Sequence, residues 1–333
     1  MASAVFVVIT TINEPTPAVR GFCRIPGHRV VVVGDRKTPA NWRCPPAVYL
    51  GPEASAGRLA AALPWNHYSR KMLGYLHAIR LGADVIYDTD DDNVPKPEWD
   101  IPPFDGVYDA TREDLGFVNL YASFTDQRIW PRGFPLPRIR DVAGVVPDAA
   151  LTPQAAQVGV WQALADGEPD VDAIYRLVDG APCVFRSRAP IVLGAGTVCP
   201  FNTQSTAVRR ALFPLLYLPS TVTFRFTDIL RGLVAQPIMW AAGYRLGFTQ
   251  ATVVQERNPH KLLADFADEV PMYLHAEEVP DRVSRAIRPD ASVAENLTRA
   301  YAALADARIV TAAESDRLSA WLDDLTPAAA GPT

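Results

Sequence analysis

The first third of the chain alternates short apolar runs with segments of helical spacing. The runs at 4–10, 29–34 and 83–87 are nearly continuous in apolar residues, and a shorter one lies at 48–50. Between them, the segment 68–81 repeats its apolar residues every three or four positions. Strands buried on both faces and separated by helices are typical of a parallel sheet with βαβ crossovers. The pattern therefore predicts an α/β fold.

The rest of the chain has a less regular pattern. Residues 94–200 are rich in proline and aromatic residues, which indicates long ordered loops with few strands. Helical spacing returns at 205–216 and at 227–243, and 276–333 has the spacing of two or three amphipathic helices. We therefore expect a mostly parallel central sheet flanked by helices, with a helical extension at the C-terminal end.

Composition narrows the class of protein. The 333 residues are 49% hydrophobic and 21% charged, enough for a large core. The net charge of −5 argues against nucleic-acid binding. No apolar run is long enough for a membrane span, and the first ten residues lack a basic region, so we expect a soluble, cytoplasmic protein. The four cysteines form no C-x-x-C pair, which gives no sign of a zinc or redox motif.

The most informative segment is A-D-V-I-Y-D-T-D-D-D-N at 83–93. Four aspartates follow an apolar strand within five positions, and their like charges repel one another. A divalent cation, Mn²⁺ or Mg²⁺, would compensate them and share its ligands with substrate phosphates. Asp90 and Asp92 point to the same side of an extended segment and are the candidate metal ligands. Asp91 faces away or toward a sugar; the alternative is a solvated acidic loop.

Other polar groups follow the neighbouring strands. Ligands of parallel sheets bind beyond the carboxyl ends of the strands, so these loops should meet. Cations at the start of the 68–81 helix oppose the helix dipole, and a bound anion would offset this. Ordinary turns and a solvated helix start are the alternatives. The candidate residues for binding a nucleotide-like ligand are Thr10, Thr11, Asn13, Glu14, Asp35, Lys37, Arg70, Lys71 and Asp91.

Two later segments carry further candidates. Asp228 follows Thr227 at a helix start, where it either stabilises the helix dipole or acts as a general base for an acceptor hydroxyl. His260 is either a third metal ligand or a structural histidine. Amide, carboxylate and guanidinium groups suit sugar hydroxyls, although a surface loop explains the acidic ones equally well. The candidate acceptor contacts are Asp170, Asp172, Arg176, Asn202 and Gln204.

Several motifs occur in order over about residues 4–275. They are V-V-I-T-T-I-N-E-P (7–15), V-V-V-V-G-D-R-K-T-P (30–39), Y-S-R-K-M-L-G-Y-L-H-A-I (68–79), D-V-I-Y-D-T-D-D-D-N (84–93), W-P-R-G-F-P-L (130–136), D-G-E-P-D-V-D-A-I-Y-R-L (166–177), C-P-F-N-T-Q-S-T (199–206) and F-R-F-T-D-I-L-R-G (224–232). With these motifs the chain resembles GT-A-fold glycosyltransferases, and most closely the STELLO-type family known from plants.

The resemblance implies a GT-A-like domain over 1–275, with a nucleotide-binding half at 1–100 and an acceptor and catalytic half at 101–275. It implies transfer from a nucleotide-sugar donor, a UDP-sugar first of all, to a hydroxyl acceptor. Asp90 and Asp92 match the D-x-D metal motif of that fold, and Asp228 matches the acidic base of many inverting members.

The sequence departs from the family in two respects. Plant STELLO-type proteins are membrane-anchored in the Golgi, whereas we expect no anchor here, so their acceptor biology is not transferred. Lys71-Met72 stands where Lys-Asn is expected. The 276–333 extension has no counterpart, and its helices either mediate self-association into a homo-oligomer or cover the core.

Two other functions remain open at this stage. One is a sugar-nucleotide mutase or nucleotidyltransferase, although T-T-I-N-E-P lacks the glycines of a nucleotidyltransferase loop. The other is a catalytically silent sugar-nucleotide-binding scaffold.

Overall fold

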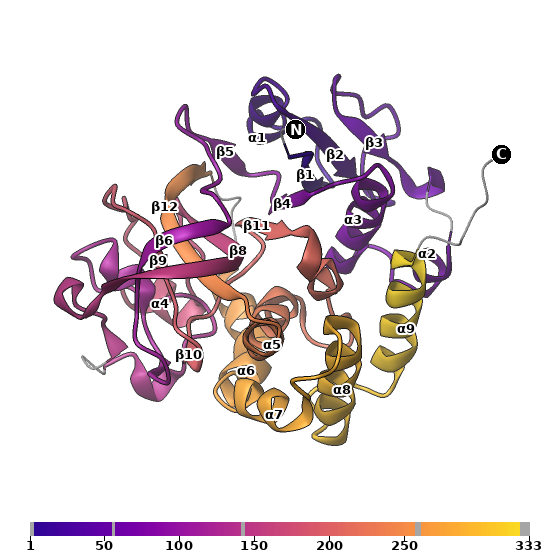
Figure 1. Ribbon diagram of the computed structural model, residues 1–333. Helices are drawn as coiled ribbons and strands as arrows, with labels where there is room; N and C mark the ends of the chain where they lie inside the picture. The colour runs from indigo at the N-terminus through magenta and orange to yellow at the C-terminus, as the bar shows by residue number, and fades with distance from the viewer. Residues whose placement is uncertain (1–2, 55–56, 141–143, 257–260, 327–333) are drawn as a thin grey trace.

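A computed structural model describes residues 3–54, 57–140, 144–256 and 261–326 (Figure 1). Its centre is a ten-stranded mixed sheet with the order β3-β2-β1-β4-β11-β8-β6-β9-β12-β5. These strands are β1 (Val5–Thr10), β2 (His28–Val33), β3 (Val48–Leu50), β4 (Val85–Thr89), β5 (Asn93–Pro95), β6 (Asp105–Ala110), β8 (Thr152–Gly167), β9 (Ile191–Val192), β11 (Ser205–Arg209) and β12 (Arg245–Gln255). A separate small sheet pairs β7 (Gly116–Phe117) with β10 (Thr197–Val198). The predicted α/β class is confirmed.

The four N-terminal strands of the sheet have the predicted parallel arrangement. β1 pairs in parallel with β2 and β4, and β2 pairs in parallel with β3. Alternate residues of β1 enter two different cores, with Phe6 and Val8 on one face and Val7 and Ile9 on the other. Burial on both faces explains why this strand is continuously apolar.

The second half of the sheet differs from the prediction. β11 runs antiparallel to both β4 and β8, so the 205–216 segment is a strand followed by a 3₁₀ helix at Arg210–Leu216, and the helix predicted there is wrong. β11 is buried between β4 and β8, and its S-T-A-V-R sequence contains β-branched residues, which pack well in such a strand. The 16-residue strand β8 also lies in the stretch expected to be mostly loop. The first six residues of β8 are mostly exposed, and its buried residues 158–166 mix apolar side chains with Gly159, Gln162 and Asp166, so no regular alternation marks the strand.

Helices cover both sides of the sheet. The first part of the chain provides α1 (Pro17–Phe22), α2 (Arg58–Ala62) and α3 (Lys71–Arg80), and the later parts provide α4 (Ala173–Val178), α5 (Thr227–Ala241), α6 (Leu262–His275), α7 (Val279–Ala286), α8 (Val293–Asp306) and α9 (Ala313–Leu325). Gly74 lets α3 approach β1 and β2, because a Cβ there would lie 2.6 Å from a methyl group of Val8.

The C-terminal helices pack onto the core. α7 and α8 contact α5, and α9 contacts α2, which connects the end of the chain to its first third (Figure 1). The Asp324 carboxylate accepts a hydrogen bond from the Leu59 backbone N–H at 3.1 Å. This packing agrees with a covering role, while self-association and the domain division at 275/276 stay predictions. No helix in the described ranges has the length and apolar character to cross a membrane.

Candidate functional site

Three loops meet at the carboxyl edge of β1, β2 and β4, as the strand order predicts. Thr38 donates its hydroxyl to the Thr11 carbonyl at 2.7 Å and joins the loops after β2 and β1. Thr11 and Asn13 both donate to the Asp91 carboxylate, at 2.5 and 3.0 Å, and join the loop after β1 to the acidic loop. Asp91 therefore faces the first loop and holds it in place.

These loops surround a cavity of about 490 Å³, which we call the main cavity. Its volume is typical of small-molecule sites. The predicted residues that line it are Thr10, Thr11, Asn13, Asp35, Lys37, Arg70, Asp90, Asp91, Asp92, Asp170 and Arg176. Glu14 is exposed and does not line it, so its predicted contact is not supported. His260 lies outside the described residues.

Lys71 has a different environment from the predicted one. Its ammonium is completely buried and lies 2.7 Å from Asp88 and 2.9 Å from Asp90. Arg231 of α5 binds the other oxygen of Asp88 at 2.8 Å. The positive charge at the helix start is thus balanced by the protein's own carboxylates. The predicted contact of Lys71 with the ligand is therefore wrong: the buried Lys71 instead fixes the position of the Asp90 carboxylate.

No cationic side chain of the described residues forms an ion pair with Asp92, so its ionised form is unbalanced. One oxygen accepts a hydrogen bond from Gln255 at 3.1 Å, while Oδ1 is buried without a hydrogen-bond partner. Burial, followed by the nearby Asp90 carboxylate, raises the pKa of Asp92 from 3.8 to about 7. Burial likewise raises the pKa of Asp90, against the opposing effect of Lys71. A cation between these side chains would remove this penalty.

The donor set fits a divalent cation that also binds phosphate. In the described ranges, no group of three or more His, Cys, Asp or Glu side chains is arranged to hold a metal ion. Mg²⁺ and its relatives are usually held by one or two protein carboxylates, with water and substrate phosphates completing the shell. The Asp90 and Asp92 pair is such a partial set, so it fits a metal that arrives with a diphosphate rather than a permanent structural site.

Another part of the wall of the main cavity combines a carboxylate with a guanidinium. Asp35 and Arg70 are both buried, and the Arg70 Nε lies 3.7 Å from the Asp35 carboxylate. Arg70 also stacks on the Trp65 ring, with its Cζ 3.8 Å from the ring centre. Its Nε and Nη1 are buried without hydrogen-bond partners. Unsatisfied donors beside a carboxylate in a cavity are suited to a planar polar ligand such as a nucleobase.

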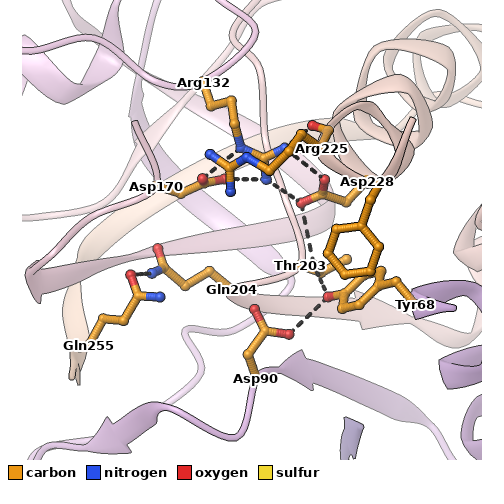
Figure 2. Close-up of a pocket in the computed structure, with 10 residues that line it drawn as sticks. Tyr68, Asp90, Arg132, Asp170, Thr203, Gln204, Arg225, Asp228 and Gln255 are labelled. Atoms are coloured by element: carbon orange, nitrogen blue, oxygen red, sulfur yellow. Dashed lines mark hydrogen bonds and ion pairs between the residues drawn. The ribbon is translucent and has the colours of Figure 1, made fainter. Parts of the chain in front are cut away.

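A smaller space of about 100 Å³ adjoins the main cavity, and we call it the inner chamber (Figure 2). Arg132 lies in its wall and donates to both oxygens of Asp228, at 3.0 and 2.8 Å. The same guanidinium binds both oxygens of Asp170, at 2.7 and 2.8 Å. These two carboxylates raise the pKa of Arg132, although burial opposes them. One cation thus holds two acidic side chains at the chamber wall.

Gly133 explains how Arg132 reaches this position. It has φ +87°, and a Cβ there would lie 2.4 Å from the Ile229 side chain of α5. Glycine adopts this conformation without strain and lets the 130–135 segment pack directly on α5. Arg132 is therefore brought against the first turn of α5, which carries Asp228.

Two hydroxyl groups connect the acidic loop with Asp228. The Tyr68 hydroxyl donates to Asp90 at 2.8 Å and shares a short hydrogen bond with Thr203. The Thr203 hydroxyl has one hydrogen, which it donates either to Tyr68 or to Asp228, 3.4 Å away (Figure 2). The candidate metal ligand and the candidate base are therefore parts of one hydrogen-bonded network.

The predicted acceptor contacts divide into two groups. Asp170 and Gln204 line the inner chamber, and Arg176 lines the main cavity, where it pairs with Glu168. Asp172 is fully buried as the N-cap of α4 and accepts from Tyr175 N and Trp130 Nε1, at 2.8 and 2.7 Å. It has no access to a ligand, so that prediction is wrong.

Asn202 also has a structural role. Its side-chain oxygen accepts from the Gln204 backbone N–H at 2.9 Å, and its carbonyl accepts from Arg231 at 2.8 Å. Asn202 is buried and lines neither cavity, so the predicted acceptor contact is wrong. A sequence such as N-T-Q-S-T does not distinguish a side chain that closes a turn from one that faces a ligand.

Several lining residues were not assigned from the sequence: Tyr68, Arg132, Thr203, Phe224, Arg225 and Gln255. Arg132 and Arg225 lie within the W-P-R-G-F-P-L and F-R-F-T-D-I-L-R-G motifs, so position in a motif was the available signal. Nothing local marks Gln255, because its role depends on the pairing of β12 with β5.

Sequence comparison gives a clear result. The chain is 26% identical to Probable glycosyltransferase STELLO2 of Arabidopsis thaliana over 351 residues, covering 96% of this chain and 44% of that protein. It is 26% identical to Probable glycosyltransferase STELLO1 of the same plant, covering 72% of this chain and 34% of that protein. The predicted resemblance to STELLO-type proteins is confirmed. The chain spans less than half the length of these relatives, and no family model matches it.

Solved structures show only distant similarity. The crystal structure of a mycobacterial protein has a TM-score of 0.40 at 12% identity and covers 82% of this chain and 74% of that one. Glucosyl-3-phosphoglycerate synthase from Mycobacterium tuberculosis, in complex with Mg²⁺ and UDP, has a TM-score of 0.36 at 10% identity, with 82% and 79% covered. Scores this low carry no part of the functional argument.

Proposed function

We propose that the protein is a metal-dependent glycosyltransferase that transfers a sugar from a nucleotide-diphosphate sugar, a UDP-sugar first of all, to a hydroxyl acceptor. The observation that carries the proposal is the junction of the main cavity with the inner chamber. Tyr68, Asp90, Asp170, Phe224, Arg225 and Gln255 line both spaces. The arrangement supplies one compartment for a donor and a second for an acceptor, and the relatives named STELLO support the same class of reaction.

The nucleotide end of the donor is assigned to Asp35 and Arg70. A uracil ring offers one N–H donor between two carbonyl acceptors, which matches a carboxylate beside unsatisfied guanidinium donors. Thr10, Thr11, Asn13 and Lys37 line the same cavity and are suited to ribose hydroxyls and phosphate.

Asp90 and Asp92 are assigned to the metal, with Mn²⁺ or Mg²⁺ as the ion. When bound, the ion would neutralise charge on the departing diphosphate. Lys71 and Tyr68 hold Asp90, and Gln255 holds Asp92, so both carboxylates are oriented before the ligand arrives. Orientation in advance lowers the free-energy cost of assembling the site.

Asp228 is assigned as the base that accepts the proton of the acceptor hydroxyl, with inversion of the anomeric centre. Each carboxylate oxygen has two lone pairs, so the hydrogen bonds from Arg132 and Thr203 leave acceptor capacity. Arg132 fixes the direction of the carboxylate. Because Asp170 shares that guanidinium, the two carboxylates together keep a net negative charge at the chamber wall.

A binding and turnover experiment tests this proposal. UDP should bind in the presence of Mn²⁺ and much more weakly with a chelator, as measured by calorimetry, and a UDP-sugar should be consumed with release of UDP. Absence of nucleotide binding would contradict the proposal. Binding without any turnover, of either hydrolysis or transfer, would favour the scaffold function instead.

A further inference from the structure

Phe224 is a lining residue to which the proposed function gives no role. Its side chain is 52% exposed, yet it lines both the main cavity and the inner chamber. Single exposed apolar residues are common on protein surfaces. Phe224, however, lies where the two cavities join, among carboxylate, amide and guanidinium groups. An apolar ring in such polar surroundings indicates a contact with a ligand.

Phe224 is held rigidly by its surroundings. It belongs to a one-turn 3₁₀ helix at Phe224–Phe226, and both sequence neighbours are tied to α6. Thr223 donates to the Asp268 carbonyl at 2.5 Å, and Arg225 donates to Glu269 at 2.9 and 2.6 Å. The Tyr68 and His67 rings pack against Phe224 at steep angles of 67° and 70°, with centroids 5.6 and 6.1 Å away. Both contacts are T-shaped rather than parallel stacks.

The charges of the inner chamber point to an uncharged ligand. Of the described residues that line it, Arg132 and Arg225 are cationic, and each is already bound to carboxylates: Asp170 and Asp228 for the first and Glu269 for the second. Asp170 and Asp228 share the single guanidinium of Arg132, and Asp90 is paired with Lys71, so each cationic side chain at the wall is already balanced by a carboxylate. A phosphorylated or carboxylated acceptor would therefore find no uncompensated side-chain cation to bind in this chamber.

The polar groups around Phe224 are suited to vicinal hydroxyls. Gln204 and Gln255 bind each other at 2.6 Å and present planar amides to the chamber. A pyranose ring has hydroxyls at its edge and C–H groups on its faces. Those C–H groups carry a small positive charge and pack well on the negative face of an aromatic ring.

We propose that the acceptor is an uncharged saccharide and that Phe224 is the platform on which its pyranose ring stacks. This inference rests on the proposed function and specifies the acceptor class for the same site. Phe224 thereby becomes a specificity-determining residue, which selects a sugar ring over a linear alcohol or an anionic acceptor.

The experiment compares matched acceptors. UDP release is measured with Mn²⁺ and a panel of UDP-sugars, using the methyl glycosides of glucose, galactose, mannose and xylose and the 6-phosphates of the hexoses. Transfer is expected to the neutral glycosides. Phe224→Ala should raise the acceptor KM by about tenfold, the effect of losing one aromatic contact, and Phe224→Tyr should restore it. Leu274→Ala is the control, because Leu274 is 70% exposed and lines neither cavity.

A binding measurement separates this inference from the proposed function. Saturation-transfer NMR of the methyl glycosides, on protein loaded with UDP and Mn²⁺, should give a signal that Phe224→Ala loses. Preference for the phosphorylated sugars, an unchanged KM in Phe224→Ala, or donor turnover without transfer to any neutral glycoside would overturn the inference. Failure of UDP to bind would instead contradict the proposed function, while glycoside binding that depends on Phe224 would still support the saccharide site.

Discussion

Arg132 donates hydrogen bonds to both carboxylate oxygens of Asp228 and, from the same guanidinium, to both oxygens of Asp170. The residue assigned as base is therefore fixed in direction by a cation from a distant part of the chain. This arrangement keeps the carboxylate aimed at the chamber. It also explains why Asp228 is buried in the first turn of α5 rather than solvated there.

Replacement of Asp228 with asparagine should reduce transfer by about 10²- to 10⁴-fold, the usual contribution of a positioned general base. UDP affinity should change little, because Asp228 lines the inner chamber but not the main cavity. Steady-state kinetics and calorimetry give the two readouts. Asp170→Asn is the matched control, since it removes the other carboxylate of Arg132, and its effect on kcat should be much smaller. Equal losses in both variants would move the assignment of the base away from Asp228.

Metal affinity should depend on pH through Asp92. Its pKa in the folded protein is about 7, raised from 3.8, so the metal-free protein holds a proton there that the unfolded chain loses near pH 4. The contribution of Asp92 to stability is therefore greatest at low pH and falls as pH rises through the window from about 4 to 7. A cation must displace that proton.

We accordingly expect Mn²⁺ affinity to rise by up to about tenfold per pH unit below pH 7 and to level off above it. Calorimetric titration with UDP present measures this profile. Asp92→Asn should bind Mn²⁺ more weakly and with a flatter profile. The same steep dependence in that variant would mean that another group controls metal binding.

Disrupting the buried ion pairs of Lys71 with Asp88 and Asp90 should lower the free energy of unfolding strongly. Lys71→Met leaves Asp88 and Asp90 without their shared cation, and breaking a buried pair in this way costs about 3–5 kcal/mol of the free energy of unfolding. Urea unfolding measures the loss. Arg186→Met is the comparison, because the Arg186–Asp126 pair is solvent-exposed and such pairs contribute about 0–1 kcal/mol. Similar small losses in both variants would show that the Lys71 network is not important for stability.

Recognition of the nucleobase should depend on Arg70. Arg70→Met should weaken UDP binding by about ten- to a hundredfold, since hydrogen bonds from a charged donor contribute about 1.5–3 kcal/mol. Arg36→Met tests the specificity of the effect, because Arg36 also stacks on Trp65, at 4.2 Å, but does not line the main cavity. Fluorescence or calorimetric titration should show normal affinity in that variant. Equal weakening in both would indicate that the Trp65 stack, rather than hydrogen bonding by Arg70, is what matters.

The parts of this site that could be predicted from the sequence are the loops that directly follow strands with a clear apolar pattern. Parallel strands place their loops at one edge, so the meeting of Thr11, Asp35 and Asp91 followed from the strand pattern alone. Contacts made by the antiparallel half could not be predicted in this way. Arg132 and Gln255 reach the site through packing on α5 and through the pairing of β12 with β5, and neither arrangement leaves a local periodic signal.

Lys71 and Asn202 show a second limit of sequence reasoning. A lysine at a helix start and an asparagine near a strand both suit a ligand, but here each satisfies a neighbouring protein group. Met72, at the position where an asparagine was expected, is buried, and its sulfur accepts a hydrogen bond from the Leu218 backbone N–H at 3.2 Å. Residue type alone does not tell which of two polar partners a side chain will meet.

The central claim is that Asp90 and Asp92 hold a divalent cation that binds the donor diphosphate. Calorimetric titration of UDP into the Asp90→Ala/Asp92→Ala double variant, with and without Mn²⁺, tests it most directly. We predict that the variant keeps its fold, as judged by circular dichroism, and binds UDP weakly and equally with or without the metal. Mn²⁺-enhanced UDP binding of wild-type strength in this variant would contradict the account.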